Sequence, residues 1–148
     1  MVIRRSLRGV AILLLAASVM VPQTLDPAGL WRILKDMLSA PNGQEAFAGT
    51  LKDAVPAGRG QLAPYLEGSL VSITPGSTGS RRLLLSMEGG AIADVTIVLR
   101  GPNTRLKTEP KKGTLIQFDG VVREFTKEPF MLTFDADHVS GLDFVNPR

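Results

Sequence analysis

The single histidine of the chain, His138, lies in a segment whose residue types could hold a metal ion. Asp135 and Asp137 come just before it. Two carboxylates and one imidazole within four residues can converge on a divalent cation, so Asp135, Asp137 and His138 are the candidate metal ligands. The further oxygen ligands and the closing glutamate of an EF-hand loop are missing. We therefore favour a solvated acidic strand end and expect no metal or other cofactor.

The same histidine is the one available base for nucleophilic catalysis. The chain has no cysteine, and no Gly-x-Ser-x-Gly elbow accompanies His138. A hydrolase with paired carboxylates would have to use Asp119, Glu124 and Asp135, which only a structure can match. We predict that the protein is not an enzyme.

Basic side chains gather in the middle of the chain and raise the question of nucleic-acid binding. Single-strand binding needs aromatic side chains among the charges for base stacking, and the strands next to these residues are aliphatic. Beyond the first 24 residues, Lys and Arg balance Asp and Glu at fourteen each. We therefore predict a solvated basic face and no nucleic-acid partner for Arg81, Arg82, Arg100, Arg105, Lys107, Lys111 and Lys112.

The excess positive charge belongs to the N-terminus. Arg4, Arg5 and Arg8 precede an apolar run over 10–21, which Pro22 ends. A basic stretch followed by an apolar stretch of this length is typical of a secretory signal peptide. We predict a signal peptide over residues 1–23 and export to the periplasm or the outside of the cell. The cleavage point stays open, and an uncleaved leader would be the tie to the membrane.

Helical spacing follows the leader, and we assign residues 25–57 to a helical extension. Asp26 and Pro27 predict a helix start, with a carboxylate at the cap and proline in the first turn. The apolar stripe of this helix comprises Leu30, Trp31, Ile33, Leu34, Met37 and Leu38. Asn42 and Glu45 resemble a capping box for a second helix that continues to residue 55.

Residues 60–140 change to strand-like patterns, and residues 141–148 form a short tail. The predicted strands cover 65–74, 82–87, 93–99, 114–125 and 130–134. Gly68 and Gly120 are candidate bulges, which let strands turn corners. We therefore predict a mainly β (α+β) fold, a five-stranded OB-like small barrel preceded by two short helices. A small sandwich is the alternative.

Several short motifs resemble an OB-like domain of bacterial exported proteins of unassigned function, sometimes found with tetratricopeptide repeats. The similarity covers residues 42 to about 137, most of the chain after the leader. The resemblance implies the barrel fold and export, and it implies no activity or ligand. The motifs are Asn42-Gly-Gln-Glu45, Leu51-Lys-Asp-Ala54, Leu66-Glu-Gly68, Ala93-Asp-Val-Thr96, Pro110-Lys-Lys-Gly113 and Phe125-Thr-Lys-Glu-Pro-Phe-Met-Leu-Thr-Phe134.

We predict a non-enzymatic binding or interaction module whose partner is an unknown protein or a small ligand of the cell envelope. OB topology would bring the loop 75–82 and the turn 126–129 to one rim, so the candidate contact residues are Arg81, Arg82, Lys127 and Glu128. The alternative is an assembly subunit of an envelope complex. It would dock through the helix face of Leu30, Trp31, Leu34, Met37 and Leu38. A helix that covers its own barrel is the simpler interpretation of that face.

Overall fold

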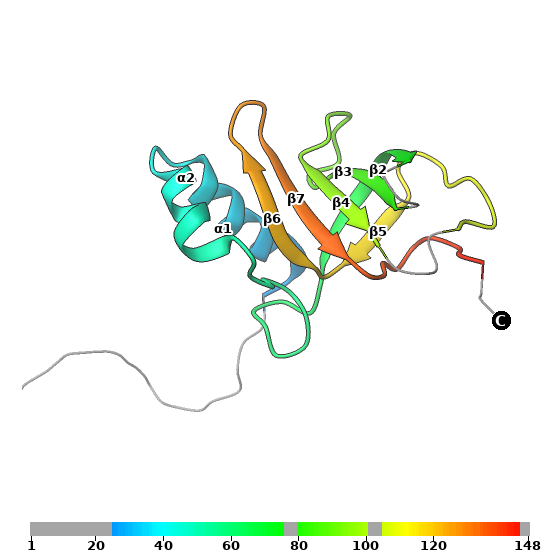
Figure 1. Cartoon of the computed structure of the whole chain (residues 1–148), viewed down its shortest axis with the longest axis horizontal. Coiled ribbons are helices and arrows are strands. Elements are labelled where there is room, and N and C mark those ends of the chain that lie inside the picture. Colours follow the sequence, from blue (N-terminus) through cyan, green and yellow to red (C-terminus); the bar gives the residue numbers. More distant parts are fainter. Residues whose placement is uncertain (1–24, 76–79, 101–104, 146–148) are drawn as a thin grey trace, which may run out of the picture.

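The computed structural model describes residues 25–75, 80–100 and 105–145. In these ranges two short helices lie beside a curled sheet that forms a half-barrel (Figure 1). The helical part comprises α1 (Pro27–Ser39), α2 (Gly43–Ala46) and one π-helical segment, η2 (Phe47–Leu51). The strands are β2 (Leu66–Pro75), β3 (Arg81–Ser86), β4 (Val95–Leu99), β5 (Leu115–Phe118), β6 (Val121–Thr126) and β7 (Met131–Ala136). The predicted leader, residues 1–23, lies outside the described residues.

The sheet has the order β5-β2-β3-β4-β7-β6. All neighbours run antiparallel except β4 and β7, which are parallel. The prediction of a mainly β fold with two short helices is confirmed. The predicted count of five strands is wrong, because the sheet has six.

The extra strand arises where the predicted strand 114–125 breaks at Asp119 and Gly120. The half before the break, β5, pairs with β2, and the half after it, β6, pairs with β7. A Cβ atom on Gly120 would lie 2.6 Å from the backbone oxygen of Asp135, so a side chain does not fit there. Because β5 and β6 are the two outer strands and only two residues join them, the sheet has to curl.

Gly68 is not the bulge that its place inside a strand suggests. It pairs in regular register with Ile116, and the irregularity of β2 falls between Leu70 and Ser72. A Cβ atom on Gly68 would lie 2.7 Å from the sulfur of Met87. The Cβ would also lie 3.2 Å from Cβ of Leu85 and 3.3 Å from the carbonyl oxygen of Ser86, so glycine eases a close approach between the strands here.

The core fills the concave side of the sheet. Register places Leu83, Ile97 and Phe134 in one row across β3, β4 and β7, and all three are fully buried. One face of α1 covers part of this core, and a row of aromatic rings joins the helices to the sheet. The successive ring contacts are Trp31–Phe130, Phe130–Phe125 and Phe125–Phe47, with centroids 5.3 to 5.9 Å apart.

The first helix begins as the sequence predicts. The side chain of Asp26 accepts a hydrogen bond of 2.7 Å from the backbone N–H of Gly29, which satisfies one of the free donors of the first turn. At the other end, Lys127 donates a hydrogen bond of 2.9 Å to the carbonyl of Ala40. A cation there also complements the negative end of the helix dipole.

The second helix departs from its prediction. The α-helical part is four residues long, a π-helical segment follows it, and the helical structure ends at Leu51 and not at 55. Asn42 makes no side-chain capping bond, so the expected capping box is wrong. Asp53, with a φ of +66°, turns the chain out of the helix, and its N–H bonds to the carbonyl of Val122 in β6.

Chain segments cover the outer sides of both edge strands in the described residues. Asp53 and Ala54 exchange backbone hydrogen bonds with Val122 of β6. Ser140 exchanges two with Gln117 of β5. Such cover removes the unpaired backbone groups that a sheet edge exposes. Among the described residues, no helix has the length and apolar character needed to span a membrane.

Candidate functional site

The residues predicted to share one rim lie at opposite ends of the sheet. Arg81 pairs with Leu99, and Leu99 pairs with Ala136 at the last residue of β7. The turn that carries Lys127 and Glu128 leads into the first residue of β7, Met131. The two ends of a six-residue strand are about 17 Å apart. A single binding rim of Arg81, Arg82, Lys127 and Glu128 therefore does not form.

The side chains of the β6–β7 turn have different surroundings from each other. Lys127 is half-buried and holds the carboxyl end of α1 through Ala40, which gives it a structural role. Glu128 is exposed beside it. At the other end of the sheet Arg82 is exposed and Arg81 is half-buried.

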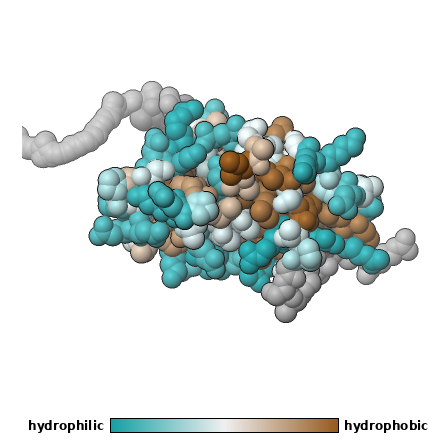
Figure 2. Space-filling view, turned by 90° about the horizontal axis from the view of Figure 1, so that it is seen from above, coloured by the Kyte–Doolittle hydropathy of each residue, from teal (hydrophilic) through white to brown (hydrophobic). Residues whose placement is uncertain are grey.

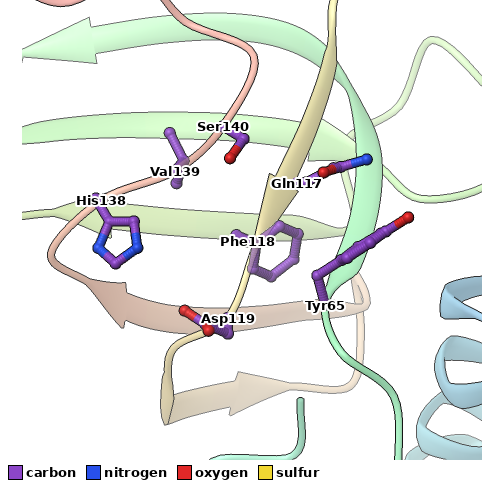
Figure 3. A pocket seen from close by; sticks show the side chains of 7 residues that line it. All are labelled: Tyr65, Gln117, Phe118, Asp119, His138, Val139 and Ser140. Carbon is purple, nitrogen blue, oxygen red and sulfur yellow. The ribbon is translucent and has the colours of Figure 1, made fainter. Parts of the chain in front are cut away.

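His138 lines a small cavity together with Tyr65, Asp119 and Ser140 (Figure 3). A serine, a histidine and an aspartate thus line the same cavity, which the sequence did not predict. No hydrogen bond joins any two of these three side chains in the described structure, so the nucleophile has no base in contact with it. The cavity measures about 120 Å³, less than ordinary small-molecule sites of 300–1,000 Å³.

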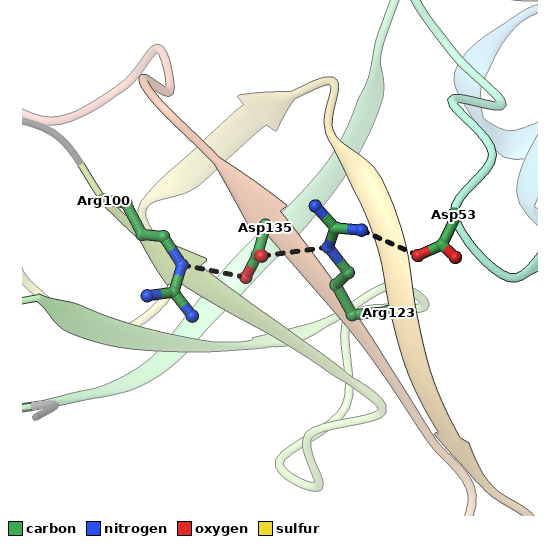
Figure 4. A network of polar contacts seen from close by, with 4 residues as sticks. All are labelled: Asp53, Arg100, Arg123 and Asp135. Carbon is green, nitrogen blue, oxygen red and sulfur yellow. Dashed lines mark hydrogen bonds and ion pairs between the residues drawn. The ribbon is translucent and has the colours of Figure 1, made fainter.

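Asp135 is held by two arginines. Its Oδ2 accepts a hydrogen bond of 3.0 Å from Nε of Arg123, and Arg100 Nε lies 3.3 Å from Oδ1. Arg123 also reaches Asp53 at 2.7 Å, so four side chains form a chain of ion pairs (Figure 4). Both carboxylate oxygens of Asp135 are thereby engaged by cations. Within the described ranges, no three histidine or acidic side chains are grouped closely enough to hold a metal ion.

The apolar face of α1 is directed into the protein's own core. The exposed fractions of Leu30, Trp31, Leu34 and Leu38 are 4% or less, and Met37 is half-buried against the core. Ile33, on the other side, is 44% exposed. Docking of a partner through the Leu30–Leu38 face would require α1 to leave its place on the sheet.

Apolar side chains also gather on the surface. Figure 2 shows such a group on the face seen from above, bordered by hydrophilic side chains. Among the described residues, the large apolar side chains with the greatest exposure are Ile92 at 83% and Leu115 at 59%. Leu115 also lines the hollow at the start of α1, so exposed apolar surface adjoins a groove beside that helix.

This α1 groove lies between the helix and the turn that follows β3. Its main part has a volume of about 460 Å³, within the range of small-molecule sites. A second hollow of about 340 Å³ continues it toward the start of α1, and the two share Ala28, Trp31 and Met87. The main part is lined by Ala28, Trp31, Arg32, Lys35, Asp36, Ser39, Met87 and Glu88.

An ion pair crosses the α1 groove. Nζ of Lys35 donates a hydrogen bond of 2.6 Å to Oε2 of Glu88, and the same ammonium lies 5.8 Å from the ring centroid of Phe130. The hydrogen bond from Lys35 lowers the pKa of Glu88, and the same bond raises the pKa of Lys35. Both groups therefore stay charged across the physiological range, and the pair joins α1 to the β3–β4 turn.

Asp94 holds the β3–β4 turn through a hydrogen bond to its backbone. Its Oδ1 accepts a hydrogen bond of 2.9 Å from the backbone N–H of Met87. Desolvation of the half-buried carboxyl raises its pKa, and the bond from Met87 opposes that rise. The negative charge of Asp94 adds slightly to the rise in the pKa of Lys35, whose main cause is the hydrogen bond to Glu88.

Trp31 carries the one buried side-chain polar atom in the described structure that lacks a hydrogen-bond partner. Its side chain is 4% exposed, and Nε1 is that atom. The carboxylate of Glu88 lies close enough for the indole N–H to lower its pKa, but outside hydrogen-bond geometry. Buried donors are almost always paired in native proteins, and an unpaired one costs about 1–3 kcal/mol. Trp31 lines the groove, and its buried N–H lies next to the carboxylate of Glu88.

Sequence reasoning placed Trp31 on the apolar face of a helix and missed the groove. Lys35 stands one turn after Trp31, and Glu88 precedes the Gly89–Gly90 turn. Neither position carries a local signal that the two residues, 53 positions apart, would meet.

The chain matches no protein-family model, and no curated protein matches it. The resemblance to exported OB-like domains stays a prediction.

Proposed function

We propose that this protein is an exported, non-enzymatic binding module that takes a ligand in the α1 groove. The observation that carries the proposal is the unpartnered N–H of Trp31 at the wall of a groove large enough for a small molecule. A ligand that displaces the exposed side chain of Glu88 and supplies an acceptor would satisfy this donor, and the apolar surfaces of Trp31 and Met87 would add contact area.

The scaffold that we propose for this module is an OB-like small barrel. In support of this, β5 and β6 can be counted as one strand bent at Gly120, which leaves five strands and links the two edges of the curled sheet. Small barrels of this type serve as binding platforms in many proteins. Export to the periplasm or the outside of the cell rests on the predicted leader.

The non-enzymatic part of the proposal is supported by the surroundings of the groups that could do chemistry. Ser140, His138 and Asp119 share no hydrogen bond around a cavity too small for most substrates. The carboxylate of Asp135 is held between two arginines. In the α1 groove the ammonium of Lys35 and the carboxylate of Glu88 are already paired with each other, which suits binding.

The experiment uses the fluorescence of Trp31, which is the only tryptophan of the chain and lines the groove. A library of small amphipathic molecules and short peptides is titrated into the protein, and hits are confirmed by calorimetry. We expect binding that changes the emission of Trp31 and weakens when Met87 is replaced by Ser.

The matched control is Ile33→Ala, on the exposed side of the same helix, which should leave affinity unchanged. Binding that Ile33→Ala weakens and Met87→Ser does not would place the ligand elsewhere. A library without any binder would contradict the proposed function.

A further inference from the structure

We infer that the α1 groove recognises the free terminal carboxylate of an extended peptide, and that Glu88 occupies the place of that carboxylate in the free protein. The inference rests on the proposed function and names the class of ligand. It starts from the two donors beside Glu88, the N–H of Trp31 and the ammonium of Lys35.

The two donors differ in kind but face the same carboxylate. Lys35 forms an ion pair of 2.6 Å with Glu88. The indole N–H of Trp31 lies close to the same carboxylate without reaching hydrogen-bond geometry. A charged donor and a neutral donor on one acceptor are a common way to bind a carboxylate, because both bonds are charge-assisted. Glu88 satisfies the first donor well and the second poorly.

Glu88 can leave this position at small cost. Its side chain is 60% exposed, and it belongs to the turn between β3 and β4, where Gly89 has a φ of +79°. Exposed ion pairs contribute about 0–1 kcal/mol, so an incoming carboxylate that also bonds to Trp31 competes effectively. Lys35 then exchanges its ion pair with Glu88 for one with the ligand's carboxylate, and the indole N–H of Trp31 gains an acceptor.

The positive charges of the groove lie in its main part, next to Glu88. Lys35 and Arg32 line this part together with Asp36, so one net positive charge remains there once Glu88 has moved away, while Asp26 and Glu67 line the second hollow. The carboxylate of Asp94 accepts a hydrogen bond from the backbone N–H of Met87. Once Glu88 has moved away, Lys35 needs a counterion, and the ligand's carboxylate supplies it.

The shape of the groove indicates a chain rather than a compact acid. From Lys35 the groove runs along α1 to Asp26 through the second hollow. Nine helical residues cover about 14 Å, which is the length of about four residues in extended conformation. Met87 and Trp31 lie where the two hollows meet, so an apolar side chain of the peptide can rest on them.

The test compares N-acetylated tetrapeptides that carry a free terminal carboxylate with the same peptides ending in an amide. Affinities are measured by the emission of Trp31 and by calorimetry on the full mature chain. We expect the free acids to bind at least about tenfold more tightly than the amides, since a hydrogen bond to a charged group contributes about 1.5–3 kcal/mol.

Two substitutions make the test specific. Glu88→Gln removes the competing carboxylate and should tighten binding of the free acids several-fold. Lys35→Met removes the counterion and should reduce the preference for acids over amides to less than about twofold. Glu128→Gln, an exposed glutamate on the β6–β7 turn, is the matched control and should change neither affinity. Because Glu88 and Lys35 lie at the surface, circular dichroism should show all three variants folded.

Equal binding of acids and amides would overturn the inference and leave the proposed function standing. Weaker binding of acids to Glu88→Gln would also overturn it, because Glu88 would then take part in recognition. If neither peptide form binds while other small molecules do, the inference fails alone. If nothing binds in the groove, the proposed function fails with it.

Discussion

Asp94 shows how burial and charge oppose each other in a single side chain. Its carboxyl is half-buried and its pKa is raised, chiefly by desolvation, while the N–H of Met87 opposes the rise. The folded protein therefore binds the proton of Asp94 more tightly than the unfolded chain does. Stability contributed by this group falls as the pH rises from below the ordinary carboxyl pKa to above the raised value.

We predict that Asp94→Asn raises the melting temperature at pH 7. The amide oxygen can still accept the bond from Met87, and the desolvated charge is gone. The gain should shrink as the pH falls through the raised pKa, because Asp94 itself then becomes neutral. Thermal melts of both proteins between pH 3 and 8 measure the difference. A less stable variant at pH 7 would mean that attraction to Lys35 outweighs desolvation.

Single residues also mark how much of the candidate site the sequence could predict. Trp31 is recognisable as part of an apolar helix face, and Asp26 as its cap. The isolation of the Trp31 N–H depends on the turn after β3, which meets α1 only in the folded protein. Side chains that are distant in the sequence and meet only in the folded protein produce no periodic pattern in the sequence, so the groove could not be predicted.

Among the elements, α1 is the one whose local sequence and tertiary role agree most closely. Its start and most of its buried stripe follow from the cap, the proline and the helical spacing, but Ile33, which was predicted to be part of that stripe, is 44% exposed. The strands were predicted to within about two residues at most ends, since alternation of side chains is a local signal. The break in the predicted fourth strand could not be predicted from local sequence. It arises because the first half pairs with β2 and the second half with β7, and both partners are distant in the sequence.

We predict that Leu34→Ala costs about 2–5 kcal/mol of unfolding free energy, because Leu34 is 3% exposed and packs in the core. Ile33→Ala, the neighbour on the exposed side of α1, should cost about 0.5 kcal/mol or less. Urea unfolding followed by circular dichroism measures both. Similar costs at the two positions would show that α1 is not anchored on the sheet as described.

For the whole molecule, Gly120 is the point at which the chain bends from one edge strand of the curled sheet, β5, to the other, β6. We predict that Gly120→Ala destabilises the protein by about 1–3 kcal/mol, because the new Cβ would meet a backbone oxygen 2.6 Å away, which cannot move without disturbing β7. Gly49→Ala is the control, since no atom lies within 4 Å of its new Cβ and alanine favours helix. Thermal or urea unfolding distinguishes the two. If Gly120→Ala is as stable as the native protein, the bend does not need glycine.

The hydrogen bond between Lys127 and Ala40 has a consequence for the order in which the helices and strands can fold. Its partners are 87 positions apart, and Trp31 near the start of the described chain packs on Phe130 near its end. Contacts of such long sequence separation form late, because the loop between them has to close first. During synthesis the N-terminal part of the chain emerges first, so α1 is complete long before the strands that bury it have been made. The first helix can therefore take up its buried position only after β7, the last strand of the sheet, has formed.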